Sequence, residues 1–331
     1  MSPGPGGAPV GPPAELLDAL SRPGEILMLG HVHPDADVLG TLFGLGLSLE
    51  GAGFAVTYAG PHPVPGMLTF LPGAARWQVW KEAPRRFALI AMTDCPNHAR
   101  AEGLLEGARA PDGVVLNIDH HPDNRRYGTV NWIDPGAAAV GEMIHDLVLA
   151  LGRPLTRDVA LNLFTAIHGD TGSFRYSNTT ERTFRIAAGL RAAGADPALV
   201  SDRLYQQRAP KALHELGAAL SLVRVSEDGR IAWLALPRGL VSDAFVDAED
   251  LVNYPRSIGG VKVALLLRET GPGVVKVSLR AKGEVPVNRI AGRFGGGGHE
   301  NAAGCTVPGA LDGATETVLA AVREALGAPA P

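Results

Sequence analysis

Four separate segments of this chain run from apolar residues directly into carboxylates or imidazoles, and this pattern limits the possible folds most. The apolar segments cover residues 26–29, 88–92, 114–118 and 161–167. The polar residues that follow them are GHVHPDAD (30–37), Thr93-Asp94, Asp119-His120-His121 and His168-Gly169-Asp170. Residues at the carboxyl ends of buried strands face the crevice where open α/β sheets bind ligands. The four segments are therefore predicted to converge on one metal centre.

The chain up to about residue 193 alternates between strand and helix patterns. We expect strands at 26–29, 54–58, 88–93 and 114–118, and helices at 13–20, 38–51, 99–106, 138–151, 158–168 and 180–193. Strands that alternate with helices indicate an α/β domain with a largely parallel sheet covered on both faces.

The pattern changes after about residue 207. We expect strands at 220–225, 231–236, 261–267 and 274–279, and helices at 287–293 and 311–326. These elements predict a smaller α+β unit. The predicted organisation is a disordered tail at 1–12, a first domain at 13–195, a linker at 196–215 that contains one helix from about 201 to 215, and a second domain at 216–327.

The composition indicates a globular protein of about two domains. The 331 residues are 46% hydrophobic and 19% charged, which is enough for sizeable cores. A net charge of −4 argues against a protein that coats long nucleic acid, but it permits a small anionic substrate. Two cysteines are too few for a disulfide framework, and no run approaches the roughly 18 apolar residues of a membrane span. We therefore expect a cytoplasmic protein with no signal peptide and no membrane partner.

The candidate metal ligands are four carboxylates and two imidazoles, with no thiolate among them: His31, Asp35, Asp37, Asp94, His120 and Asp170. Such a set favours a hard ion, and the imidazoles favour Mn²⁺ over Mg²⁺. Six ligands exceed what one ion takes while it also holds water and substrate. Two ions about 3.5–4 Å apart suit an in-line phosphoryl displacement. Each residue alone also fits a helix cap or a core histidine, so the prediction depends on their occurring together in this order.

These motifs resemble those of the DHH phosphoesterases, and within them the nano-RNase and pAp phosphatase group. The similarity covers nearly the whole chain and includes GHVHPDADVLGT (30–41), NIDHHPDN (117–124), GTVNWIDP (128–135), IHGDTGSFRYSNTT (167–180) and RFGGGGHENAAG (293–304). It implies an N-terminal parallel-sheet DHH domain and a C-terminal DHH-associated domain.

The resemblance also implies a role for each ligand. His31 and Asp35 would hold one ion, Asp37, His120 and Asp170 would hold the other, and Asp94 would bridge them. His121 would contact the scissile phosphate and protonate the leaving oxygen, and Asp119 would orient a histidine. His33 has no assigned role, and we expect it to be structural or to lie at the rim.

A glycine run in the second domain is the other informative stretch. Gly296, Gly297 and Gly298 leave backbone amides accessible to an anion, and a helix that begins near Glu300 would add its positive end. The run resembles the GGGH motif with which the family binds the substrate end away from the metals. We expect His299 to act with it and Arg280 to fork onto a phosphate. Other residues fit either the rim or ordinary surface and core positions: Arg125, Arg126, Phe174, Arg175 and Tyr176.

The predicted activity is two-metal hydrolysis of short oligoribonucleotides to mononucleotides, and of pAp to AMP and phosphate. The same first domain also serves inorganic pyrophosphatases, RecJ-like exonucleases and phosphodiesterases of cyclic or linear dinucleotides, such as cyclic di-AMP or pApA. The dinucleotide phosphodiesterases are the main alternative. A regulatory nucleotide-binding module with an inactive centre is a more remote one, and a purely structural protein is the least plausible. The Ala/Leu-rich helices leave a homodimer open.

Overall fold

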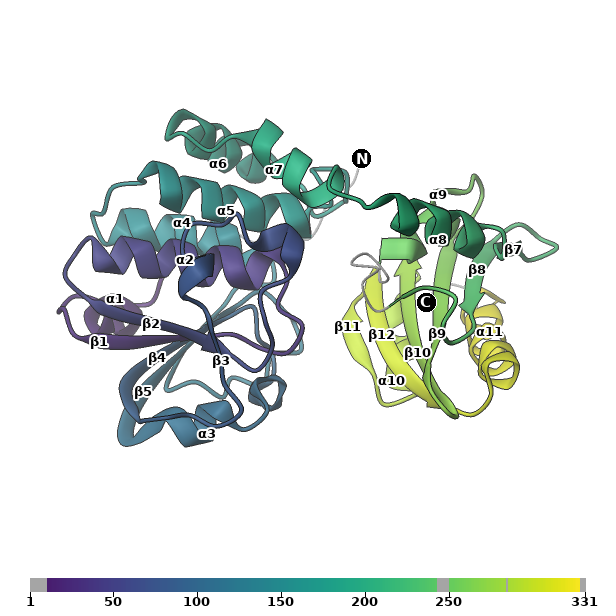
Figure 1. Cartoon of the computed structure of the whole chain (residues 1–331), viewed down its shortest axis with the longest axis horizontal. Helices are drawn as coiled ribbons and strands as arrows, with labels where there is room; N and C mark the ends of the chain where they lie inside the picture. Colours follow the sequence, from purple (N-terminus) through teal and green to yellow (C-terminus); the bar gives the residue numbers. More distant parts are fainter. Residues whose placement is uncertain (1–10, 243–249, 284, 328–331) are drawn as a thin grey trace. The chain divides into compact units, whose positions relative to one another are not determined.

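The computed structural model describes residues 11–242, 250–283 and 285–327. The chain forms two compact units, Met1–Gln207 and Arg208–Pro331 (Figure 1). Most of the predicted disordered tail, residues 1–10, lies outside the described part. Among the described residues no helix is both long and apolar enough to cross a membrane.

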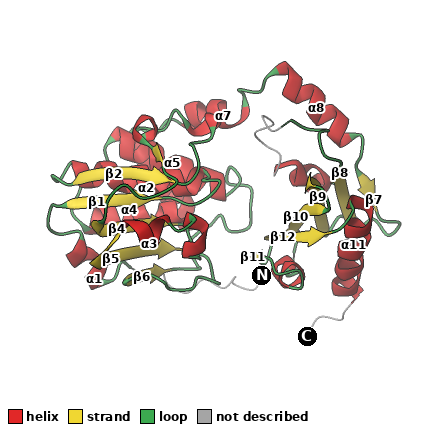
Figure 2. Ribbon diagram, turned by 60° about the horizontal axis from the view of Figure 1, so that its bottom comes forward, coloured by secondary structure: helices red, strands yellow, loops and turns green. Residues whose placement is uncertain are grey.

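A parallel sheet forms the centre of the first unit. Its six strands lie in the order β3-β2-β1-β4-β5-β6, and every neighbouring pair is parallel (Figure 2). The strands are β1 (Glu25–Leu29), β2 (Ala55–Gly60), β3 (Gln78–Val79), β4 (Phe87–Thr93), β5 (Arg109–Asp119) and β6 (Val130–Ile133). The predicted parallel α/β domain is thus confirmed.

Helices cover both faces of this sheet. Successive side chains of a strand point to opposite faces, so alternate residues of the strands enter two different cores. Ile26 and Met28 of β1 join a core with the helices on one face, whereas Leu27 and Leu29 join a second core on the face of α3 (Figure 1). The helices are α1 (Ala14–Ala19), α2 (Ala36–Glu50), α3 (Leu104–Ala108), α4 (Val140–Ala150), α5 (Arg157–Asp170), α6 (Glu181–Ala192) and α7 (Pro197–Tyr205).

The predicted helix at 99–106 is wrong, because two shorter helices replace it. A 3₁₀ turn, His98–Ala101, precedes α3, and Glu102 and Gly103 between them have φ angles of 52° and 80°. Left-handed residues cannot continue a right-handed helix. Strands β3 and β6 are short, and they were not predicted.

The second unit also has a central six-stranded sheet, in the order β11-β12-β10-β9-β8-β7. Among its described strands only the β8–β9 pair is parallel, so the sheet is mixed. Its strands are β7 (Arg224–Val225), β8 (Ile231–Leu236), β9 (Val263–Gly271), β10 (Val274–Ala281), β11 (Gly297–His299) and β12 (Ala302–Pro308). The helices are α8 (Pro210–Leu220), α9 (Asn253–Ser257), α10 (Val287–Gly292) and α11 (Leu311–Gly327). This architecture confirms the predicted α+β unit.

The single connecting helix expected at 201–215 is two helices, and the strand expected at 220–225 is mostly absent. Helix α7 ends at Tyr205, and α8 begins at Pro210. Proline at a first helical turn is tolerated, but within a helix it removes a hydrogen bond and clashes with the preceding turn. Helix α8 then continues to Leu220, so only Arg224 and Val225 pair as a strand.

The glycine run forms the edge of a β-hairpin, so the expected helix near Glu300 is also wrong. Gly297–His299 pairs antiparallel with β12, and Gly298 has a φ of 130°. A Cβ on Gly296 would lie 2.1 Å from the carbonyl oxygen of Gly304 and 2.5 Å from Cys305 Cβ. Close approach of two backbones therefore explains Gly296 independently of any ligand.

We expect Gly296→Ala to destabilise the second unit by about 2 kcal/mol, because the added methyl group overlaps backbone that cannot move aside. Urea unfolding monitored by tryptophan fluorescence measures this change. Gly313→Ala on α11 is the matched control, since a Cβ there meets nothing within 4 Å and alanine favours the helix. Equal stability of the two variants would contradict the steric argument.

Candidate metal centre

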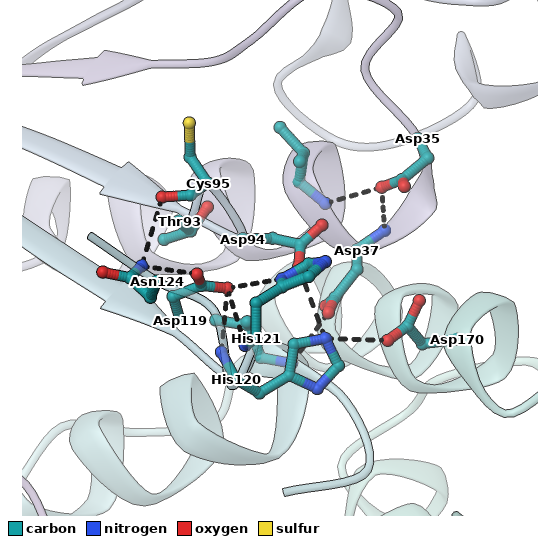
Figure 3. Close-up of polar contacts among 12 residues, drawn as sticks. Asp35, Asp37, Thr93, Asp94, Cys95, Asp119, His120, His121, Asn124 and Asp170 are labelled. Atoms are coloured by element: carbon teal, nitrogen blue, oxygen red, sulfur yellow. Dashed lines mark hydrogen bonds and ion pairs between the residues drawn. The ribbon is translucent and has the colours of Figure 1, made fainter. Parts of the chain in front are cut away.

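Three neighbouring strands of the first sheet each lead into one candidate ligand, and the start of α2 and the end of α5 provide the other three (Figure 3). His31 follows β1, Asp94 follows β4 and His120 follows β5, and these three strands are adjacent in the sheet. Asp35 is the N-cap of α2, where its Oδ1 accepts the backbone N–H groups of Asp37 and Val38 at 3.0 and 3.1 Å. Asp170 is the last residue of α5. The structure thus brings residues from five elements to one edge of the sheet.

Asp37 is buried and held by the first turn of α4. Its Oδ2 accepts the Val140 N–H at 2.7 Å, and its Oδ1 accepts the Gly141 N–H at 3.0 Å. Burial raises the pKa of Asp37 well above its usual value, and the negative charges of Asp170 and Asp94 raise it further. A divalent cation would remove this repulsion between carboxylates.

His120 directs one ring nitrogen toward two of these carboxylates. Its Nδ1 donates to the carbonyl of Ala137 at 3.0 Å, while its Nε2 lies 3.2 Å from Asp170 Oδ2 and 3.4 Å from Asp94 Oδ1. Ligand atoms of Asp37, Asp94 and His120 all lie within 4.8 Å of one another. Burial opposes ionisation of Asp94, but nearby imidazoles, His120 first, outweigh it and hold the pKa of Asp94 below its usual value.

His31 provides the clearest sign that the site takes a cation. The side chain is fully buried, and its Nδ1 lies 2.7 Å from the Val32 carbonyl. A carbonyl can only accept, and this contact is shorter than the 3.2 Å between Nδ1 and Arg100 Nη2, so we assign Nδ1 as the donor. The lone pair of Nε2 then has no hydrogen-bond partner among the described residues. Burial, and next the charge of Arg100, lower the pKa of His31 to about 4, so the ring is neutral near pH 7. A buried neutral imidazole with an unused nitrogen fits a metal ligand.

His121 and Asp119 form a separate pair beside the carboxylates. Asp119 is fully buried, and its Oδ1 accepts from His121 Nδ1 at 2.8 Å and from the backbone N–H of His120 at 2.8 Å. Burial lowers the pKa of His121, but Asp119 and then Asp94 outweigh it, so the net shift is upward. His121 Nδ1 also lies 3.4 Å from Asp94 Oδ1.

Two residues of this site were not predicted. Asn124 donates through Nδ2 to Asp119 Oδ2 at 2.5 Å, and it stands in the quoted motif NIDHHPDN. Arg100 Nη2 lies 3.2 Å from His31 Nδ1, and the Arg100 carbonyl accepts the Val32 N–H at 2.8 Å. No sequence pattern near Arg100 marks it, because the contact joins the 3₁₀ turn His98–Ala101 to the segment after β1, which is far away in the sequence.

Several predicted rim residues have other contacts. Phe174 packs against the rings of Phe164 and Phe184, which favours its core interpretation over base stacking. Arg175 Nε donates to the Gly172 carbonyl at 2.6 Å. His33 has a φ of 50°, and its backbone N–H donates to His62 Nδ1 at 3.2 Å, a structural contact at an exposed position.

In the second unit the strand register aligns the predicted anion-binding residues. Arg280 of β10 lies opposite Ala302 of β12, and Ala302 lies opposite His299 of β11. Residues directly opposite one another point to the same face of a sheet, so Arg280 and His299 share a face two strands apart. Gly297 and Gly298 are in β11, and Gly296 directly precedes it. Arg280 Nη1 also donates to the Leu279 carbonyl at 3.0 Å.

Comparison with known proteins identifies the family. The N-terminal domain of the DHH family matches residues 25–167, and the DHHA1 domain matches residues 245–328. A crystal structure of an exopolyphosphatase-related protein from Bacteroides fragilis has a TM-score of 0.83 at 25% identity, covering 93% of this chain and 95% of that one. The chain belongs to the DHH family of phosphoesterases.

Two curated relatives define the group within this family. The chain is 38% identical over 314 residues to the bifunctional oligoribonuclease and PAP phosphatase NrnA of Thermus thermophilus, covering 95% of this chain and 93% of that protein. It is 30% identical over 304 residues to NrnA of Bacillus subtilis, covering 88% and 92%. The chain is therefore a member of the nano-RNase and pAp phosphatase group, as the sequence motifs indicated.

Proposed function

We propose that this protein hydrolyses short oligoribonucleotides to mononucleotides and pAp to AMP and phosphate, with two divalent ions, preferably Mn²⁺. The main support for this proposal is that five candidate ligands meet at one edge of the sheet: His31, Asp37, Asp94, His120 and Asp170. Burial and the charges of Asp170 and Asp94 raise the pKa of Asp37, and His31 Nε2 has no hydrogen-bond partner among the described residues. The NrnA relatives support the choice of substrates.

Each part of the site has a proposed task. We assign His31 and Asp35 to one ion, Asp37, His120 and Asp170 to the other, and Asp94 to both. When bound, the ions supply a water nucleophile of lowered pKa and neutralise charge on the phosphoryl oxygens. Asp119 accepts from His121 Nδ1 and so orients the ring, and we assign His121 the delivery of a proton to the leaving oxygen. Arg280, Gly296, Gly297, Gly298 and His299 bind a terminal phosphate or base of the substrate.

Hydrolysis of cyclic di-AMP or pApA as the main activity is the second candidate. The chain is 26% identical to the cyclic-di-AMP phosphodiesterase GdpP of Geobacillus thermodenitrificans over 94% of this chain, but this spans only 48% of that protein. The identity is lower than with the NrnA relatives, so this activity ranks second.

Two further assignments belong to the proposal. We place the protein in the cytoplasm, because both cysteines, Cys95 and Cys305, are buried free thiols. A homodimer remains an expectation from the Ala/Leu-rich helices, and light scattering of the purified protein measures it.

The test is mononucleotide release by the purified protein with Mn²⁺ from pAp, pApA, a longer 5′-phosphorylated RNA and cyclic di-AMP. We expect fast turnover of pAp and pApA and slow turnover of the longer RNA. Preference for cyclic di-AMP would favour the second candidate. Absence of any turnover, with Mn²⁺ binding demonstrated, would favour a regulatory module.

A further inference from the structure

The segment 137–141, which leads into α4, contacts two of the proposed ligands through backbone atoms. The carbonyl of Ala137 accepts from His120 Nδ1, and the amides of Val140 and Gly141 donate to Asp37. The carbonyl of Ala138, in the middle of this segment, accepts from Asn178 Nδ2 at 2.9 Å. Asn178 thus contacts the same segment that holds His120 and Asp37.

The Asn178 amide also contacts a third ligand. Its Nδ2 donates to the backbone carbonyl of Asp170 at 3.1 Å. An amide nitrogen carries two hydrogens, so one asparagine can tie two carbonyls together. Aspartate has the same shape and no hydrogen to donate. The Asn178 amide therefore joins the segment 137–141 to the end of α5, which carries Asp170.

The chain between Asp170 and Asn178 has an unusual backbone. Gly172, Ser173 and Phe174 have φ angles of 54°, 63° and 62°, three left-handed residues in succession. Such conformations cost about 1 kcal/mol or more for residues other than glycine, and they persist where surrounding contacts maintain them. The amides of Arg175 and Tyr176 both donate to the Thr171 carbonyl at 3.0 Å. These bonds close the turn, so that Asn178 lies next to Asp170.

We propose that Asn178 is a positioning residue that fixes Asp170 relative to His120 and Asp37, and so sets the affinity for the ion that these three ligands share. This inference rests on the proposed function, because it assumes that they bind a divalent ion. Asn178 is exposed, so we expect its contribution to the free energy of unfolding to be small. Its replacement should therefore alter the metal centre more than the fold.

The test compares Asn178→Asp and Asn178→Ala with the wild-type protein. Ser177→Ala is the matched control, because Ser177 is the exposed neighbour. Mn²⁺ affinity is measured by calorimetric titration, the pairing of two Mn²⁺ ions by electron paramagnetic resonance, and unfolding by thermal denaturation. We expect both Asn178 variants to bind one of the two ions, the one assigned to Asp37, His120 and Asp170, about 10 to 100 times less tightly, with the melting temperature nearly unchanged. Excess Mn²⁺ should restore their turnover of pApA.

Wild-type Mn²⁺ affinity and an unaltered paramagnetic spectrum in both Asn178 variants would overturn the inference. A large loss of melting temperature with no change in affinity would also overturn it, because Asn178 would then act on the fold alone. Failure of the proposed function gives a different result, in which the wild-type protein turns over neither pAp nor pApA. The Mn²⁺ titration still tests Asn178 in that case.

Discussion

Asp94→Asn is expected to abolish hydrolysis of both pAp and pApA while the protein remains folded. The carboxylate of Asp94 faces His120 and His121 and is the proposed bridge between the two ions. Asparagine has the same size and tolerates the left-handed backbone at this position, where φ is 52°. It lacks the charge that two cations require. We expect kcat to fall on the order of a thousandfold, which corresponds to about 4 kcal/mol in activation free energy.

Steady-state rates with saturating Mn²⁺, together with metal content, measure this effect. Asp112→Asn is the control, since Asp112 is exposed in the first half of β5. It should retain wild-type rates. Near-wild-type turnover by Asp94→Asn would exclude Asp94 as a ligand shared by two ions. If Asp94→Asn lost the native circular dichroism spectrum, the same measurements would be made on Asp35→Asn. Asp35 is the N-cap of α2, and asparagine can also fill that position.

The sequence predicted β1, β2, β4 and β5 of the first sheet, because each of these strands contains a run of mostly apolar residues, whereas the short strands β3 and β6 are too short to show one. Ile26–Leu29 has no polar residue to obscure the strand, and a parallel sheet needs helices between its strands. The same logic selected the candidate ligands His31, Asp94 and His120, since each comes within two residues of the end of a strand. Strand β12, Ala302–Pro308, was not predicted, because its small residues, Ala302, Ala303 and Gly304 among them, give a weak apolar signal.

Backbone contacts set the limit of sequence prediction at the site. Asp37 was predicted as a ligand, but its partners are the amides of Val140 and Gly141, which any residue except proline can supply. Likewise, an accessible amide run was expected at the glycines, whereas Gly296 is required because two backbones meet there. The amino-acid sequence indicates which side-chain groups are present. It does not indicate which backbone groups will come into contact in the folded protein.

His121→Gln is expected to slow hydrolysis of substrates whose leaving oxygen needs a proton, and to have little effect on substrates whose leaving group departs as a stable anion. The Asp119 carboxylate holds His121 Nδ1 at 2.8 Å, and His121 has a pKa raised by Asp119 and Asp94 against the opposing effect of burial. A protonated His121 suits a general acid, and glutamine cannot donate a proton to a leaving oxygen. We expect kcat for pApA to fall about 10² to 10⁴-fold, the usual range for loss of acid–base catalysis.

The p-nitrophenyl ester of a nucleotide separates this role from a structural one. The p-nitrophenolate ion leaves without a proton, because p-nitrophenol is a far stronger acid than a ribose hydroxyl. His121→Gln should therefore hydrolyse this ester at nearly the wild-type rate, and His214→Gln, on the exposed face of α8, should be unaffected with either substrate. An equal loss with both substrates would mean that His121 binds or positions the phosphate instead. In that case the Asp119–His121 pair would stabilise substrate binding, and proton delivery would have to come from water.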